Sequence, residues 1–136
     1  MEELAWLVLQ AMVGRYHVID VLYLYYVERL DARRIGRRLG MGGYSIRSIV
    51  EGVWFEVRSV YTLQSYLSRY YPVLLEVEPV MVPSEDGFTC RLCGTSVLRL
   101  PARHVLDRHQ DLVLLVRDMV VREGRARAGR AGASQA

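Results

Sequence analysis

Apolar residues in the first half of the chain recur every three or four positions, the spacing of one face of an α-helix. Gly14 interrupts the first such run, and Asp31 is a good N-cap for the third. The next stretch, 53–58, fits either a helix extension or a strand. The pattern predicts helices over Glu2 to Val13, His17 to Leu30, Ala32 to Leu39, and from Tyr44 onward.

The pattern changes near Pro72, which is expected to end a helix over Thr62 to Tyr70. Residues 73–82 then alternate between apolar and polar, as in a strand with one buried face. Pro79 would confine that strand to a sheet edge, since proline cannot donate to a neighbouring strand. We therefore expect a small sheet built from 73–82, Phe88 to Cys90 and Ser96 to Leu100.

A last helix is expected from Pro101 to Glu123, with apolar residues on more than one of its sides. That arc is too wide for one packing partner, so the helix is either central in the fold or the interface of a homodimer. Simple burial against residues 1–30 is the alternative to a dimer. The tail from Gly124 is rich in alanine, glycine and arginine and is expected to be disordered.

Four of the five cysteines and histidines fall between residues 90 and 109, in the pattern C-x2-C-x10-H-x4-H. Two closely spaced cysteines can direct both sulfurs at one ion, and two histidines on a helix can add two nitrogens. Zinc takes four such ligands, so the pattern predicts a zinc site at Cys90, Cys93, His104 and His109. The alternative is a lone disulfide, or two buried thiols, beside two unrelated histidines.

This stretch resembles the two-Cys, two-His zinc fingers. Phe88 stands two residues before the first cysteine and Val97 four after the second, where that family carries an aromatic and a core hydrophobe. The ten residues between Cys93 and His104 are fewer than the roughly twelve of fingers that read DNA, and Pro101 leaves little helix ahead of His104. The resemblance therefore implies a structural finger, whose four protein ligands leave no open position for catalysis.

Residues 31–54 resemble a helix-turn-helix. Gly36 is the small residue which that family carries inside its first helix, and Gly40 is the glycine that follows this helix. The family's apolar positions in the turn and the second helix are matched by Met41, Ile46 and Ile49. A packed pair of helices with no DNA partner would satisfy the same pattern.

Charge favours nucleic acid as the partner of this segment. Residues 29–47 hold six arginines and one acidic residue, although the whole chain has a net charge of only +3. Arginines suit phosphate contacts, and Arg47 could read a guanine edge in the major groove. The residues expected to contact double-stranded DNA are Arg33, Arg34, Arg37, Arg38, Tyr44, Ser45, Arg47 and Ser48. A solvated basic face is the alternative.

Composition narrows the class of protein. The chain is 51% hydrophobic and 24% charged, which is typical of a globular protein, and all 18 basic residues are arginine. No stretch reaches the roughly 18 apolar residues of a membrane-spanning helix, so no membrane partner is expected. The acidic start Met1-Glu2-Glu3 is unlike a signal peptide, which points to the cytoplasm. No nucleophile motif, phosphate-binding loop or carboxylate pair is recognised, so neither an enzyme nor a small-molecule substrate is expected.

The fold class expected is mostly α with a small β hairpin: an N-terminal helical bundle with a helix-turn-helix, then a ββα-like zinc finger with an extended helix. The predicted domains are residues 1–72, residues 73–123 and a disordered basic tail, 124–136. The function expected is sequence-specific binding of double-stranded DNA by a transcriptional regulator with structural zinc. A zinc-stabilised protein-interaction module and an RNA-binding protein are the alternatives.

Overall fold

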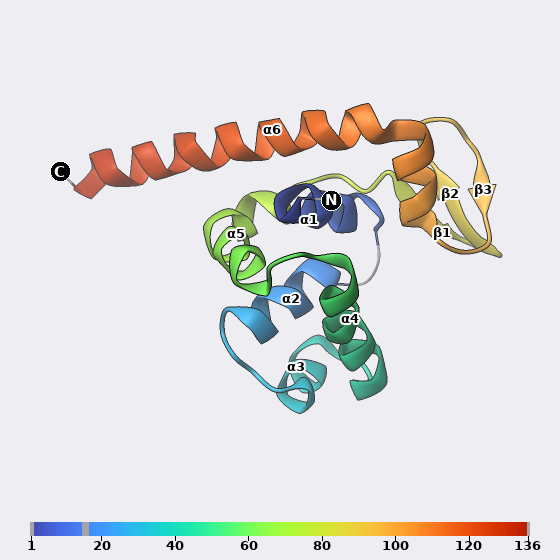
Figure 1. Ribbon diagram of the computed structural model, residues 1–136, viewed down its shortest axis with the longest axis horizontal. Helices are drawn as coiled ribbons and strands as arrows, with labels where there is room; N and C mark the ends of the chain where they lie inside the picture. The colour runs from blue at the N-terminus through green and yellow to red at the C-terminus, as the bar shows by residue number, and fades with distance from the viewer. Residues whose placement is uncertain (1, 15–16, 136) are drawn as a thin grey trace.

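The computed structural model describes residues 2–14 and 17–135, with side chains described to Arg130. Within this part of the chain, six helices and a small three-stranded antiparallel sheet confirm the expected fold class, mostly α with a small β hairpin (Figure 1). In chain order the elements are α1 (Glu3–Met12), α2 (Val18–Tyr26), α3 (Ala32–Leu39), α4 (Gly43–Glu56), α5 (Val60–Leu74), β1 (Met81–Ser84), β2 (Gly87–Cys90), β3 (Ser96–Val97) and α6 (Pro101–Gln135).

Helix α1 is the centre of the core. It packs against α2, α5 and α6, and α6 passes along one side of it (Figure 1). Its apolar residues are buried on nearly all sides, with at most 3% of the surface exposed at Leu4, Leu7, Val8, Leu9 and Met12. One hydrophobic core therefore contains residues from both of the predicted domains, 1–72 and 73–123.

The tyrosines of α2 take part in packing. Tyr26 is 7% exposed and its hydroxyl donates to the carbonyl of Val50 in α4, at 3.0 Å. Tyr23 stacks on Tyr71 of α5 with ring centroids 3.9 Å apart. These rings join α2 to α4 and α5, although α2 ends at Tyr26 rather than at Leu30.

Helices α3 and α4 follow each other directly and are joined by the short turn 40–42. Asp31 caps α3, because its carboxylate accepts the amide of Arg34 at 2.8 Å. Residues 53–56 belong to α4, so of the two alternatives for 53–58 the helix is correct up to Glu56. Ile35 of α3 and Ile46 of α4 are both fully buried and fix the crossing of the two helices.

The turn between α3 and α4 depends on two glycines. Gly40 has φ +68°, a left-handed conformation that ends α3 and that residues with a Cβ rarely adopt. Gly36 lies so close to the turn that a Cβ at this position would be 2.8 Å from the carbonyl oxygen of Met41. The small residue expected inside the first helix is therefore required by the backbone that follows it.

Pro72 does not end α5, contrary to the prediction. The helix runs Val60–Leu74 with Pro72 inside it. A proline inside a helix removes one amide donor and crowds the carbonyl four residues earlier. Here that carbonyl belongs to Ser68, which is exposed, so water can solvate it. Val73 and Leu74 are 7% and 1% exposed, and burying each contributes about 2 kcal/mol, which offsets part of that cost.

The strand predicted over 73–82 is wrong for most of its length. Residues 73 and 74 complete α5, a connection follows, and β1 begins only at Met81. In the connection the amide of Val80 donates to the carbonyl of Met12 at 2.7 Å, so this segment runs along the end of α1. The alternating pattern reflects partial burial beside α1, and not pairing with another strand.

The sheet has the order β1-β2-β3, with all pairs antiparallel. Pro83 lies in the edge strand β1, whereas Pro79, the proline expected at the edge, lies outside the sheet. Phe88 in β2 pairs with Val97 in β3, and both are half-buried against the core. Strand β3 ends at Val97, three residues before the predicted end at Leu100.

Helix α6 consists of two segments joined by a bend. His109 has φ −135° and ψ 31°, which is not helical, and the ribbon turns sharply there (Figure 1). Beyond the bend Val113 and Val120 are 1% and 2% exposed and face the core. Leu114, Leu115 and Met119 are about half exposed, whereas Leu112, Val116 and Val121 are partly buried against the core. The helix is not central, because α1 occupies the centre; its buried side packs on α1 and α5, in part as the burial against residues 1–30 would predict, and the homodimer stays a prediction.

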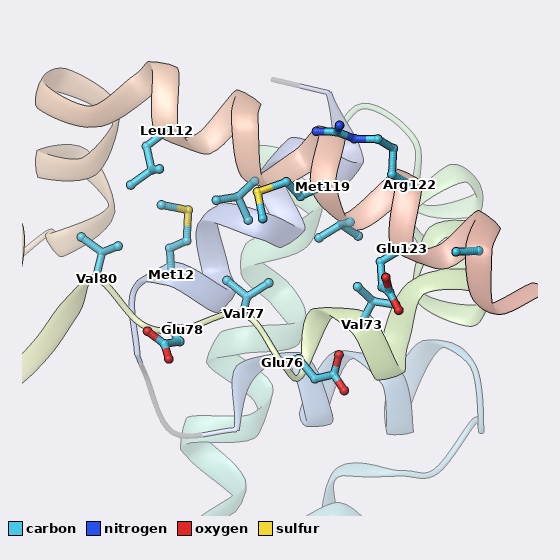
Figure 2. Close-up of a pocket in the computed structure, with 13 residues that line it drawn as sticks. Met12, Val73, Glu76, Val77, Glu78, Val80, Leu112, Met119, Arg122 and Glu123 are labelled. Carbon is cyan, nitrogen blue, oxygen red and sulfur yellow. The ribbon is translucent and has the colours of Figure 1, made fainter.

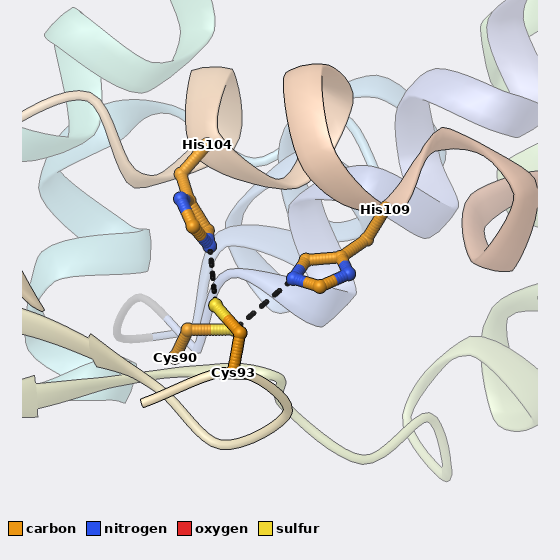
Figure 3. A group of neighbouring side chains, drawn as sticks. All are labelled: Cys90, Cys93, His104 and His109. Carbon is orange, nitrogen blue, oxygen red and sulfur yellow. Dashed lines mark hydrogen bonds between the residues drawn. The ribbon is translucent and has the colours of Figure 1, made fainter. Parts of the chain in front are cut away.

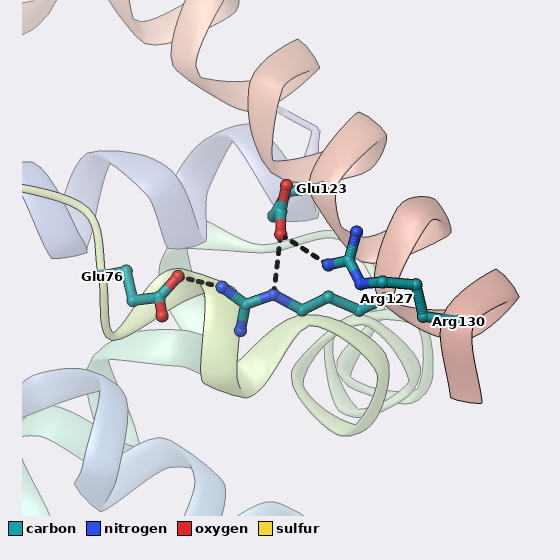
Figure 4. Close-up of polar contacts among 4 residues, drawn as sticks. All are labelled: Glu76, Glu123, Arg127 and Arg130. Carbon is teal, nitrogen blue, oxygen red and sulfur yellow. Dashed lines mark hydrogen bonds and ion pairs between the residues drawn. The ribbon is translucent and has the colours of Figure 1, made fainter. Parts of the chain in front are cut away.

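The tail from Gly124 is helical, and the prediction of disorder is wrong, because α6 continues to Gln135. Arg127 donates to the carboxylate of Glu123 at 2.9 Å and also pairs with Glu76, which follows α5 (Figure 4). The first pair supports the helix along its own axis and the second ties it to the rest of the fold. The tail is rich in alanine, which has the highest helix propensity, and the prediction of disorder did not take this propensity into account.

No helix in the described part of the chain is both long enough and apolar enough to cross a membrane.

The close approach at Gly36 leads to a prediction. Gly36→Ala should lower the free energy of unfolding by about 1–3 kcal/mol, because the new methyl group must displace the backbone at Met41. Gly52→Ala is the matched control: it lies inside α4 with no atom near its Cβ position, and should raise stability by about 0.5–1 kcal/mol. Urea unfolding followed by circular dichroism measures both. Equal effects at the two positions would contradict the packing described for the turn.

Candidate metal centre

The two cysteines occupy a tight turn that follows β2. Cys90 is the last residue of β2, and its amide donates to the carbonyl of Thr95 at 2.8 Å. Its carbonyl in turn accepts the amide of Gly94 at 2.9 Å, which closes the loop around Cys93. Cys90 is buried and Cys93 exposed, and neither is part of a disulfide. The alternative of a lone disulfide is therefore not what the structure contains.

The two histidines come from α6 on either side of its bend. An α-helix turns about 100° per residue, so residues five apart would point about 140° away from each other. His104 lies in the first segment, and the non-helical backbone at His109 rotates the second ring back toward the first. The two rings are 5.3 Å apart between centroids, and both lie over the cysteine turn (Figure 3). The bend is therefore what makes the H-x4-H spacing workable.

One ligand atom from each of Cys90, Cys93, His104 and His109 lies within 4.8 Å of every other. Sγ of Cys90 is 3.4 Å from Nε2 of His109, and Sγ of Cys93 is 3.4 Å from Nε2 of His104 (Figure 3). Two sulfurs and two nitrogens thus surround one point. The four residues that the sequence singles out are close enough to bind a metal ion.

The environment of Cys93 favours its thiolate, which is the form that binds metals. Its Sγ lies 3.1 Å from the hydroxyl oxygen of Thr95. Hydrogen bonds from the Thr95 hydroxyl, then from the Thr95 amide and His109, lower the pKa of the Cys93 thiol to about 5. Thr95 was not identified from the sequence, although its place two residues after a cysteine is a usable signal for such a contact.

A metal ion here would connect the cysteine turn to the first segment of α6, which otherwise follow each other through β3 and residues 98–100. The amide of Arg91 donates to the carbonyl of Val80 at 2.9 Å, so the cysteine turn is also tied to the start of β1. Across the site, Val105 between the histidines is fully buried. Binding would link the sheet to the first segment of α6.

The eight residues expected to contact DNA lie on a different part of the molecule, on α3 and the first half of α4 (Figure 1). All have exposed side chains: Arg33, Arg34, Arg37, Arg38, Tyr44, Ser45, Arg47 and Ser48. Tyr44 is 86% exposed, far more than a packing residue would be.

Three of these arginines line one shallow hollow of about 510 Å³. Arg33 and Arg37 come from α3, and Arg47 comes from α4. Gly43, the first residue of α4, also lines the hollow, so the positive end of a helix dipole adjoins three guanidinium groups. The structure thus brings together charges from two helices.

The other two arginines of α3 lie outside this hollow. Arg38 forms an ion pair with Glu28 at 3.3 Å, and Arg34 is exposed. An exposed pair of this kind contributes little to stability, so Arg38 stays available to a stronger partner.

Sequence reasoning missed a group of exposed aromatic residues near the end of α4. Trp54, Phe55 and Tyr61 are 66%, 89% and 82% exposed. The sequence of residues 53–58 fits either a helix or a strand, and these two structures place different side chains on the exposed face. Once a helix is assumed, Trp54 and Phe55 fall outside the buried row at Ile46, Val50, Val53 and Val57.

The geometry of the four ligands leads to a prediction. Cys93→Ser should reduce the metal content from one ion per chain to a small fraction, and should unfold at least residues 83–110. His17→Ala is the control, because His17 is the remaining histidine and lies at the start of α2. Metal analysis after dialysis and hydrogen exchange over 83–110 measure the two effects. A full complement of metal in Cys93→Ser would refute the four-ligand site.

Comparison with known proteins does not assign this chain to a family. No protein family, no curated protein and no solved structure matches it.

Proposed function

We propose that this protein is a transcriptional regulator that binds double-stranded DNA in a sequence-specific manner through α3 and α4, with a structural zinc ion held by Cys90, Cys93, His104 and His109. The observation that carries the DNA proposal is the hollow lined by Arg33, Arg37 and Arg47 beside the exposed start of α4.

Zinc is the metal that the ligand set fits best. Two thiolates and two imidazoles are its usual structural ligands. With metal–sulfur bonds of about 2.3 Å and metal–nitrogen bonds of about 2.05 Å, tetrahedral angles put sulfur and nitrogen about 3.6 Å apart. The two closest sulfur–nitrogen distances, both 3.4 Å, are near that value. Four protein ligands leave no position for substrate, so zinc would contribute folding energy rather than catalysis.

The hollow between α3 and α4 has the chemistry of a phosphate-binding surface. Guanidinium groups pair with phosphate oxygens, and the amide end of a helix attracts anions. Arg47 extends toward the amino end of α4, since a Cβ on Gly43 would be 3.5 Å from one of its nitrogens. In DNA-binding helix-turn-helix proteins that end of the second helix meets the bases. Arg47 is thus suited to read a base, and Arg33 and Arg37 to hold the backbone.

The second candidate function is a zinc-stabilised protein-interaction module. It is favoured by the exposed Trp54, Phe55 and Tyr61, because aromatic residues are enriched at the centres of protein interfaces. An interaction module predicts a stable complex with a protein and little affinity for duplex DNA.

The proposal places the protein in the cytoplasm, where a reducing environment keeps both thiols available as ligands.

The metal's identity gives the first test. The purified protein should contain zinc, and cobalt substitution should produce the visible absorption of tetrahedral cobalt bound to thiolates. Addition of a chelator should unfold the sheet and the first segment of α6, because four ligands anchor them to each other. A cobalt spectrum typical of octahedral oxygen coordination would contradict the assignment.

DNA binding is tested by fluorescence anisotropy with random and selected duplexes at several salt concentrations. Affinity should fall steeply with salt, and Arg37→Ala should weaken all duplexes about equally and reduce the salt slope by about 1. Arg47→Ala should instead relax sequence preference, at a cost of about 1–3 kcal/mol for the preferred site.

Arg103→Ala is the matched control, since it removes one exposed arginine at the start of α6, far from α3. It should leave binding nearly unchanged. The proposal for α3 and α4 is wrong if all three variants bind every duplex with the affinity of the parent. It is also wrong if the parent binds single-stranded RNA more tightly than duplex DNA.

A further inference from the structure

Helix α6 carries an apolar strip whose outer residues the described chain leaves exposed, while Leu112 and Val116 at its inner edge are partly buried against the core. Beyond the bend, Leu115 and Met119 are 51% and 53% exposed. With Leu112 and Val116 they follow the three- and four-residue spacing of one helix side. Leu114 is 48% exposed but lies about 100° around the helix from Leu115, so it is outside the strip.

The strip borders an open apolar groove of about 870 Å³ (Figure 2). One wall is the strip side of α6, and the other is the end of α5 with the connection to β1. Met12 of α1 is part of the lining, and Leu112, Met119, Val77 and Val80 face one another across the groove (Figure 2). The lining is mostly apolar, and it is wide enough to receive side chains from another helix.

A ridge of charges runs beside the strip. Asp111, Asp118, Arg122 and Arg125 are exposed, and at 100° per residue they fall on one side of α6. Within the described residues Asp111, Arg122 and Arg125 make no ion pair, and Asp118 pairs only with its neighbour Arg117. The acids occupy the amino-terminal half of the ridge and the arginines the carboxy-terminal half.

This order of charges identifies the partner that fits. In an antiparallel pair of α6 helices related by a two-fold axis near Met119, Asp118 would face Arg122 of the second copy and Asp111 would face Arg125. The midpoints of these pairs are residues 120 and 118, so an axis at residue 119 leaves each pair offset by two residues, about 3 Å along the helix, which a long arginine side chain can span. A parallel pair would instead place each acid beside the same acid.

We propose that α6 forms an antiparallel homodimer interface, in which Leu115 of each copy enters the groove of the other. The ridge then supplies four ion pairs beside the apolar contact, and fixes the register. This inference deepens the proposed function, since helix-turn-helix proteins commonly bind paired half-sites as two-fold dimers. The homodimer can be tested without DNA.

The oligomeric state of the full zinc-loaded chain, measured by sedimentation velocity without DNA, tests the interface. The parent should be a dimer of the 15.6 kDa chain at micromolar concentration. Leu115→Asp should raise the dimer dissociation constant by about a hundredfold or more, because each copy loses one buried leucine. Leu98→Asp, the control at an exposed leucine outside α6, should remain a dimer.

The charges give a second and independent test of the register. Asp118→Arg and Arg122→Asp should each weaken the dimer, and the double variant should restore it, because the exchanged charges again face each other. A folding defect would not be rescued in this way.

A monomeric parent would overturn the proposal. If this monomer also binds an apolar dye at the groove, the groove would be assigned to a small molecule. A dimer that both Leu115→Asp and the charge variants leave intact would place the interface elsewhere. A dimer that fails to bind DNA would contradict the proposed function alone.

Discussion

The bend of α6 at His109 is the constraint on which the rest of the structure depends. Before the bend the helix must present His104 to the cysteine turn, and after it Val113 and Val120 must pack on α1 and α5. A straight helix could satisfy only one of these directions. The residue that changes the direction is itself a metal ligand, so a bound ion would hold the bend and the packing together.

This arrangement separates three surfaces of the molecule. The cysteine turn lies at one end of α6, and α3 and α4 lie on the side of α1 away from α6 (Figure 1). The apolar strip lies on α6 just beyond its bend, beside the groove. In the proposed dimer the two α6 helices meet while α3 and α4 of both copies remain exposed. Metal binding, self-association and DNA binding would thus use different residues and could be altered one at a time.

The errors in predicting the fold have a common physical cause. Pro72 remains inside α5 because Val73 and Leu74 are buried, and the alternating residues 75–80 follow the end of α1 rather than a strand. The tail is helical, and its Arg127 pairs with Glu76, a residue that follows another helix. In each case a contact distant in sequence outweighed the local preference, and no local pattern contains such a contact.

The sequence by itself determined the helices with strong periodicity, the exposed basic face of α3, and the ligand types, because each depends on the identity and spacing of neighbouring residues. Tertiary structure decided which helix is central, how two histidines five residues apart meet one site, and which apolar residues stay exposed. Leu114, Leu115 and Val113 are adjacent and alike in chemistry, yet only Val113 is buried. Burial depends on the direction from which α1 and α5 approach, and composition does not contain that direction.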